Sequence, residues 1–228
     1  MDAFEFVNQQ PLKTVLFDLD GTLADTAPDL ADALNTVLTN NGKTPLPFAQ
    51  IRPVVSHGGI ALVRLGFGIE PGHPEFEALR QQLLAVYSSG IANKTQLFPG
   101  MAELLSSIET AGMNWGVVTN KPAWLTEPLM DALQLTQRAA SIVSGDTLAE
   151  RKPHPSPLLY ACEQAGSHSM ECVYVGDAER DIVAGQRAGM KTVVALFGYI
   201  GEDDNPASWG ADALLESPQH IKEWLQLR

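Results

Sequence analysis

Short, mainly apolar runs recur along the chain, mostly bounded by Asp, Asn or Gly. Runs of this length without polar alternation predict strands buried on both faces, as in a parallel sheet. Five segments have this pattern: Thr14–Leu19, Trp115–Thr119, Ser141–Val143, Cys172–Val175 and Thr192–Leu196.

Amphipathic segments with helical spacing lie between these runs, at Met101–Ala111, Pro122–Leu133, Pro155–Ala165 and Ala178–Ala188. Alternating strands and helices predict crossover units, and therefore a doubly wound, mostly parallel, Rossmann-like α/β sheet. Ligands of such sheets bind beyond the carboxyl ends of the strands.

Residues 24–94 break this alternation, because they contain no convincing strand. Amphipathic segments occur instead at Pro28–Asn40, Phe48–Val54, Gly59–Gly66 and Glu75–Ala92. We predict an inserted all-helical domain at 24–94, with residues 1–23 and 95–228 forming the α/β core. Pro99 and Gly100 punctuate the return to the core.

Composition narrows the possible partners and compartment. A formal net charge of -12 and the lack of any dense Lys/Arg run argue against nucleic acid and against a basic membrane-binding surface. No apolar stretch approaches the roughly 18 residues of a membrane helix. Asp2 and Glu5 are unlike a secretion signal, and Cys162 and Cys172 are expected to be reduced core thiols. We therefore expect a cytoplasmic protein.

Asp18 and Asp20 close the first predicted strand, followed by Gly21 and Thr22. Residues two apart on an extended chain point the same way, so the two carboxylates are expected to converge. Their repulsion would be relieved by Mg²⁺, which prefers carboxylate oxygens, waters and phosphate as ligands. The alternative is a simple Asp-Gly turn.

A second acidic pair follows another predicted strand. Asp177 comes directly after Gly176, and Asp181 lies one helical turn further on. A helix cap is the alternative role for Asp177. Two acidic pairs at two strand ends nevertheless match the needs of a hard metal ion.

Anion-binding groups are expected at the same edge of the sheet. Thr119 and Asn120 end a strand where a helix begins, although they also suit a simple cap. Lys152 lies in a loop stiffened by Pro153 and Pro155, where a solvated side chain is the usual alternative. Because the acidic pairs and the anion-binding groups follow successive strands, we expect them to form one site for a metal ion and an anion.

Together these motifs resemble those of the haloacid dehalogenase superfamily of phosphohydrolases, over nearly the whole chain. They occur in order as Asp18-Leu19-Asp20-Gly21-Thr22, Thr119, Lys152 and Gly176-Asp177-Ala178-Glu179-Arg180-Asp181. The helical insertion matches the position of that superfamily's cap domain.

The resemblance implies a mechanism. Asp18 would be the nucleophile that forms an aspartyl-phosphate, and Asp20 would be the general acid and base. Mg²⁺ would be bound by Asp18, Asp177 and the backbone carbonyl of Asp20, with Asp181 in support.

The resemblance also implies that the phosphoryl oxygens are held by Thr119, the N–H of Asn120 and Lys152. Gly176 and Thr22 would support the loops around them.

Other activities of the superfamily can be weighed by residue type. Dehalogenases lack the second aspartate because halide needs no proton, so Asp20 favours a phosphate ester. Phosphonate hydrolases use a cap lysine, whereas Lys43 and Lys94 lie near the edges of the insertion or in turn-like sequence. A non-catalytic relative is disfavoured because Asp18 and Asp20 are both present. A sugar phosphomutase stays open.

Within the superfamily, the chain is most similar to phosphoglycolate phosphatases with small helical caps. The likeness is carried by residues 25–30, 118–122, 199–201 and 206–212. The same segments resemble phosphatases of N-acetylmuramic acid 6-phosphate in cell-wall recycling, so either small phosphate ester is a candidate substrate. Monomer and homodimer both stay open.

One loop of the insertion is the candidate substrate-facing surface. Its two glycines allow close backbone approach, its polar side chains suit a polar leaving group, and two flanking arginines suit a substrate carboxylate. The alternative is a helix–helix turn with solvated arginines. The residues are Ser56, His57, Gly58, Gly59, Arg52 and Arg64.

Overall fold

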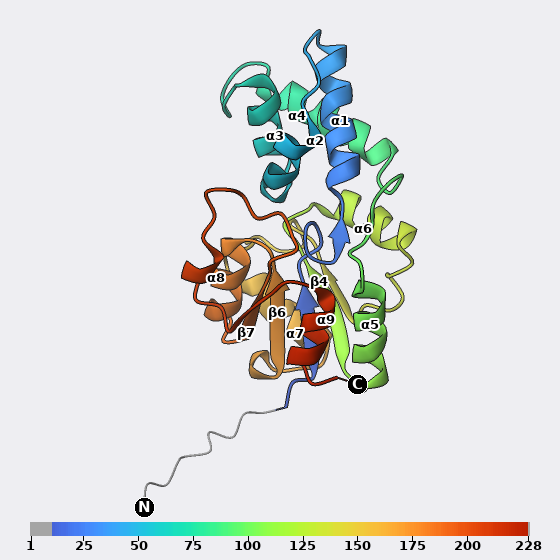
Figure 1. The fold of residues 1–228 in the computed structure, drawn as a ribbon, viewed down its shortest axis with the longest axis vertical. Helices are drawn as coiled ribbons and strands as arrows, with labels where there is room; N and C mark the ends of the chain where they lie inside the picture. Colours follow the sequence, from blue (N-terminus) through green and yellow to red (C-terminus); the bar gives the residue numbers. More distant parts are fainter. Residues whose placement is uncertain (1–10, 228) are drawn as a thin grey trace, which may run out of the picture.

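A computed structural model describes residues 11–227, which form an α/β part and a helical part beyond one edge of its sheet (Figure 1). Residues 1–10 and 228 lie outside the described part, and so do Asp2 and Glu5, on which the expectation about export partly rested. No helix in residues 11–227 is long and apolar enough to cross a membrane.

Six parallel strands form one sheet in the order β5-β4-β1-β6-β7-β8. Their bounds are β1 Thr14–Phe17, β4 Asn114–Val118, β5 Ser141–Val143, β6 Cys172–Gly176, β7 Lys191–Ala195 and β8 Ala213–Leu215. The predicted fold class is confirmed. The edge strand β8 was not predicted, because it is short and only partly buried.

Helices on both faces explain why the strand sequences are apolar without alternation. The helices are α5 Met101–Thr110, α6 Ala123–Ala132, α7 Ser156–Gln164, α8 Glu179–Arg187 and α9 Pro218–Trp224, with 3₁₀ turns at η2 Ser169–Glu171 and η3 Pro206–Ser208. Val15 and Phe17 of β1 belong to the buried cluster of Leu105 in α5, whereas Leu16 belongs to that of Leu158 in α7. Successive side chains therefore enter different apolar layers.

The two cysteines are buried in the core as free thiols, as predicted, and they lie in the second of these layers. Cys162 and Cys172 are both free and buried, and the Cys162 thiol donates to the Cys172 sulfur at 3.0 Å.

The helical part is inserted through an antiparallel pair of two-residue strands, β2 Ala24–Asp25 and β3 Gln96–Leu97. It comprises α1 Ala27–Asn40, α2 Phe48–Ile51, η1 Arg52–His57, α3 Gly58–Phe67 and α4 Phe76–Ser89. Leu34, Leu62 and Leu83 are buried in its interior. The helix expected at Phe48–Val54 ends early and continues as 3₁₀ turns, since Pro53 has no N–H for an α-helical hydrogen bond.

Asp29 joins the two chain segments that enter and leave the helical part. Its buried carboxylate accepts hydrogen bonds from the backbone N–H of Lys94 and from both the N–H and the hydroxyl of Thr95.

We expect Asp29→Ala to lower the free energy of unfolding by about 2 kcal/mol, because it strands several buried donors. Urea unfolding measures the loss. The matched control is Asp32→Ala on the same helix, whose exposed ion pair with Lys94 should contribute nothing measurable. An equal change for the two variants would contradict the assignment.

Candidate active site

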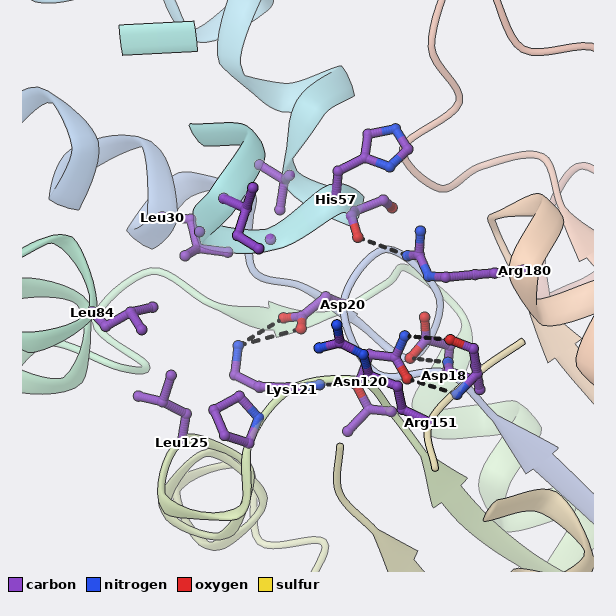
Figure 2. A pocket seen from close by; sticks show the side chains of 18 of the residues that line it. Asp18, Asp20, Leu30, His57, Leu84, Asn120, Lys121, Leu125, Arg151 and Arg180 are labelled. Carbon is purple, nitrogen blue, oxygen red and sulfur yellow. Dashed lines mark hydrogen bonds and ion pairs between the residues drawn. The ribbon is translucent and has the colours of Figure 1, made fainter. Parts of the chain in front are cut away.

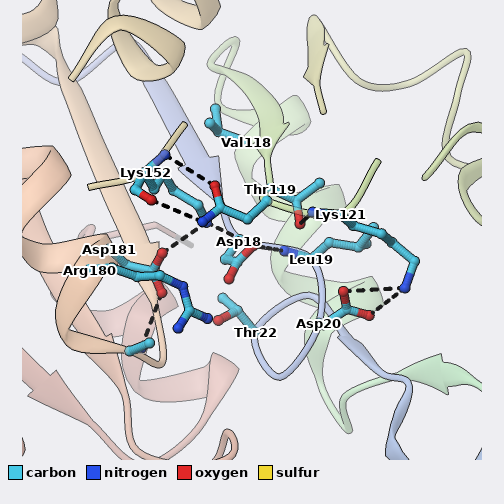
Figure 3. A network of polar contacts seen from close by, with 12 residues as sticks. Asp18, Leu19, Asp20, Thr22, Val118, Thr119, Lys121, Lys152, Arg180 and Asp181 are labelled. Atoms are coloured by element: carbon cyan, nitrogen blue, oxygen red, sulfur yellow. Dashed lines mark hydrogen bonds and ion pairs between the residues drawn. The ribbon is translucent and has the colours of Figure 1, made fainter. Parts of the chain in front are cut away.

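Asp18 and Asp20 lie in the turn after β1, because the strand ends at Phe17 and not at the expected Leu19. The alternation of an extended chain therefore does not carry their carboxylates to one spot. Asp20 accepts hydrogen bonds from Thr26 Oγ1 at 2.6 Å and Lys121 Nζ at 3.0 Å, and Figure 3 shows it well separated from the Asp18 carboxylate.

Two glycines let the strand-end loops approach closely. Gly21 has φ of +83°, and a Cβ there would lie 2.2 Å from an Asp177 oxygen. A Cβ on Gly176 would lie 2.4 Å from Cβ of Asp181. Thr22 Oγ1 donates to Asp177 Oδ1 at 3.2 Å. These positions therefore hold the acidic loops against one another.

Three buried carboxylates gather at this edge of the sheet. Oxygens of Asp18, Asp177 and Asp181 lie within 4.8 Å of one another. The three come from the ends of two adjacent strands and from the first turn of α8. Asp181 thus joins the cluster directly, while the Asp20 side chain does not belong to it.

The cluster has the properties of a site for a hard cation. Asp177 Oδ2 accepts from Ser56 Oγ at 2.7 Å and from the Tyr199 N–H at 2.9 Å, and both donors are neutral. Burial, followed by the charges of Asp18 and Asp181, raises the pKa of Asp177 to about 7. A divalent cation would remove this penalty, and the all-oxygen donor set suits Mg²⁺.

Lys152 is buried beside the cluster. Its Nζ lies 2.9 Å from Asp18 Oδ1 and 2.8 Å from Asp181 Oδ1 (Figure 3). It also donates to Tyr174 Oη at 2.7 Å. The Asn120 side chain fixes the Lys152 backbone, accepting from its N–H at 3.1 Å and donating to its carbonyl at 2.9 Å. The loop thus delivers a fixed positive charge to Asp18.

A cavity of about 450 Å³ opens above this cluster, between the sheet edge and the helical part (Figure 2). Asp18, Thr119, Asn120 and Lys152 line its floor, and Asp20 also faces it. Its apolar lining includes Leu30, Val55, Ile60 and Leu84 of the helical part and Leu125, Pro122 and Pro153 of the α/β core.

The predicted substrate-facing loop does line the cavity, through Ser56, His57, Gly58 and Gly59. Arg180 of α8 donates to the Ser56 carbonyl at 2.7 Å, which ties the loop to the α/β core. Burial and then the Arg180 charge lower the pKa of His57, which favours the neutral imidazole.

The two flanking arginines lie elsewhere. Arg52 donates to the carbonyls of Gly198 and Phe197, and Arg64 pairs with Glu70 on the surface. Neither lines the cavity. In this arrangement Arg52 is engaged by backbone carbonyls of the α/β core and Arg64 by a surface carboxylate.

A buried link that the sequence pattern does not predict joins the helical part to Asp20. Lys121 Nζ contacts Asp20 Oδ1 at 3.0 Å and Tyr87 Oη of α4 at 2.9 Å. Burial lowers the pKa of Lys121, but the charge interactions and hydrogen bonds with Asp20 and Tyr87 together outweigh burial, so the net pKa is raised. Burial raises the pKa of Tyr87 to about 12. Lys121 adjoins the Thr119-Asn120 motif, whereas no sequence pattern points to Tyr87.

The fold and the strand-end site are those of a haloacid dehalogenase-like hydrolase. The model of that family matches residues 15–195, and the chain belongs to the family. The predicted family is confirmed.

Curated relatives are similar over nearly their whole length. A phosphoglycolate phosphatase from Xanthomonas campestris pv. campestris is 46% identical over 211 residues, covering 92% of this chain and 95% of that protein. An N-acetylmuramic acid 6-phosphate phosphatase from Pseudomonas aeruginosa is 43% identical over 210 residues, covering 92% and 93%. The crystal structure of a predicted phosphoglycolate phosphatase from Haemophilus somnus has a TM-score of 0.83 and 27% identity, covering 93% and 97%.

Proposed function

We propose that this phosphoric monoester hydrolase works through an aspartyl-phosphate on Asp18. The observation that carries the proposal is the contact between the Asp18 carboxylate and the buried Lys152 ammonium, at the floor of a cavity beside two further carboxylates. A carboxylate nucleophile and a fixed cation that neutralises phosphoryl charge are what phosphoryl transfer needs.

In the first step, an Asp18 oxygen bonds to phosphorus as the ester P–O bond breaks, and Asp20 gives its proton to the leaving alkoxide. In the second step, Asp20 takes a proton from a water whose oxygen attacks phosphorus, and the bond to Asp18 breaks. The contacts of Asp20 with Lys121 and Thr26 support this role, since they hold its side chain at the cavity wall.

Thr119, the N–H of Asn120 and Lys152 hold the phosphoryl oxygens in this proposal. Mg²⁺ would be held by Asp18, Asp177 and the Asp20 carbonyl, with Asp181 beside them. When bound, it supplies positive charge that offsets the carboxylates and the phosphate dianion.

Phosphoglycolate is the first candidate substrate, on the basis of the relative with 46% identity. N-acetylmuramic acid 6-phosphate is the second candidate. The cavity's volume of about 450 Å³ and its apolar wall favour N-acetylmuramic acid 6-phosphate, because the two-carbon leaving group of phosphoglycolate would fill little of the cavity. The helical segment 24–94 acts as the specificity domain in either case, and a cytoplasmic location suits both substrates.

A phosphate-release panel tests the proposal, using phosphoglycolate, N-acetylmuramic acid 6-phosphate, hexose phosphates, a nucleotide and an aryl phosphate. The highest kcat/KM identifies the substrate, because specificity is a difference in transition-state binding. Release from none of these esters would overturn the proposed activity.

Metal removal should stop turnover. We expect EDTA to abolish phosphate release, Mg²⁺ to restore it, and Mg²⁺ to raise the Tm of the wild-type protein, since a ligand that binds only the folded state stabilises it. Asp177→Asn should remove the rise in Tm. Undiminished hydrolysis in EDTA, or an equal rise in the variant, would contradict the metal assignment.

A further inference from the structure

Arg151 stands apart among the cations of the central cavity. Five Lys or Arg side chains line it: Arg80, Lys121, Arg151, Lys152 and Arg180. Four of the five have partners, since Lys121 contacts Asp20, Lys152 contacts Asp18 and Asp181, Arg180 donates to Ser56, and Arg80 pairs with Glu77. Within residues 11–227, the Arg151 guanidinium has no hydrogen-bond or ion-pair partner.

The backbone that carries Arg151 is nevertheless held in place. Its carbonyl accepts the His154 N–H at 2.9 Å. The next residue, Lys152, has both backbone groups bonded to the Asn120 side chain. Figure 2 shows Arg151 beside Asn120, on the core side of the cavity. An exposed, unpaired guanidinium therefore extends from a loop that is fixed relative to Asp18.

The chemistry of this position fits a second anion. In the proposed mechanism the phosphoryl group already has Lys152, Thr119 and the N–H of Asn120. A guanidinium offers a planar fork of donors that matches a carboxylate in two parallel hydrogen bonds. Arg80, which also lines the cavity, already has Glu77 of its own helix as a partner, whereas Arg151 has none within residues 11–227.

We propose that Arg151 binds a carboxylate on the leaving group, and so gives the enzyme a preference for phosphate esters that carry one. The proposal rests on the proposed phosphatase function and assigns to Arg151 the role that the sequence pattern suggested for Arg52 and Arg64.

Paired substrates test it. Phosphoglycolate is compared with phosphoglycolamide, in which a neutral amide replaces the carboxylate. N-acetylmuramic acid 6-phosphate is compared with N-acetylglucosamine 6-phosphate, which lacks the lactyl carboxylate. We expect wild type to prefer the acid in at least one pair. Arg151→Gln should lower kcat/KM for that acid by about 10- to 100-fold and leave its neutral partner within about twofold.

Two further variants sharpen the result. Arg151→Lys keeps the charge and should recover part of the preference. Arg187→Gln is the matched control, because Arg187 donates to the Pro153 carbonyl of the same loop and does not line the cavity; its preference should equal that of wild type.

Equal losses of kcat/KM for the acid and its neutral partner in Arg151→Gln would assign Arg151 to the phosphoryl group and overturn the proposal. The proposal would also be overturned if kcat/KM did not change in Arg151→Gln, or if wild type preferred the acid in neither pair. These outcomes leave the phosphatase function standing. Release from none of the four esters would overturn the role of Arg151, and only release from none of the wider panel as well would overturn the phosphatase function.

Discussion

Asp18→Asn is expected to abolish phosphate release, with kcat reduced by more than about 1,000-fold, because a carboxamide cannot take the place of the carboxylate nucleophile. The substitution keeps the size and shape of the side chain. Steady-state phosphate release on the best substrate of the panel measures the loss, and trapped phosphoenzyme in wild type alone would locate the intermediate.

The fold of this variant should be intact. Carboxylate oxygens of Asp18, Asp177 and Asp181 lie within 4.8 Å of one another, so removing the Asp18 charge reduces repulsion inside the cluster. Lys152 keeps Asp181 as its counter-ion, and Tm in EDTA should therefore not fall. Asp32→Asn, which changes an exposed carboxylate of α1, is the control and should keep wild-type kcat. A folded Asp18→Asn protein with near wild-type turnover would rule out the mechanism.

Lys152→Met is expected to damage both stability and turnover. Lys152 is buried and contacts Asp18 and Asp181, and its removal leaves those two carboxylates without their counter-ion. Breaking a buried pair from one side costs about 3–5 kcal/mol. Urea unfolding in EDTA should show a loss of that size, and kcat should fall by about 100- to 1,000-fold, the range for one lost charge-stabilising donor.

A double variant separates charge from packing. Asp18→Asn combined with Lys152→Met leaves fewer unpaired carboxylates, so it should be more stable than Lys152→Met alone. Lys94→Met removes the lysine of an exposed pair with Asp32 and should leave stability unchanged. If the double variant is no more stable than Lys152→Met, the loss comes from packing and the electrostatic explanation is wrong.

The strand-end motifs were predictable because their spacing is a local property. A parallel strand buried on both faces must end at the same edge of the sheet as its neighbours, so polar residues following β1, β4 and β6 had to meet. Gly21 was equally readable, since its turn requires positive φ. These features needed only the order of strands and the preferences of single residues.

Side-chain direction was harder to predict. The side chains of Asp18 and Asp20 point to different places because β1 ends at Phe17 and because Lys121, 101 residues from Asp20 in sequence, binds the Asp20 carboxylate. Tyr87 reaches Lys121 from α4, and Ser56 reaches Asp177 from η1. These contacts depend on how the helical part sits on the sheet, which hydrophobic periodicity does not encode.

The sequence by itself determined the α/β architecture, the helical insertion and most residues of the candidate site, because burial periodicity and turn chemistry are local. Tertiary structure alone decided which charges are paired. It placed Asp181 with Asp18 and Asp177, engaged Arg52 with distant carbonyls, and left Arg151 unpaired within the described residues. Pairing depends on distances of a few Å between segments far apart in the chain, and only the packed molecule sets those distances.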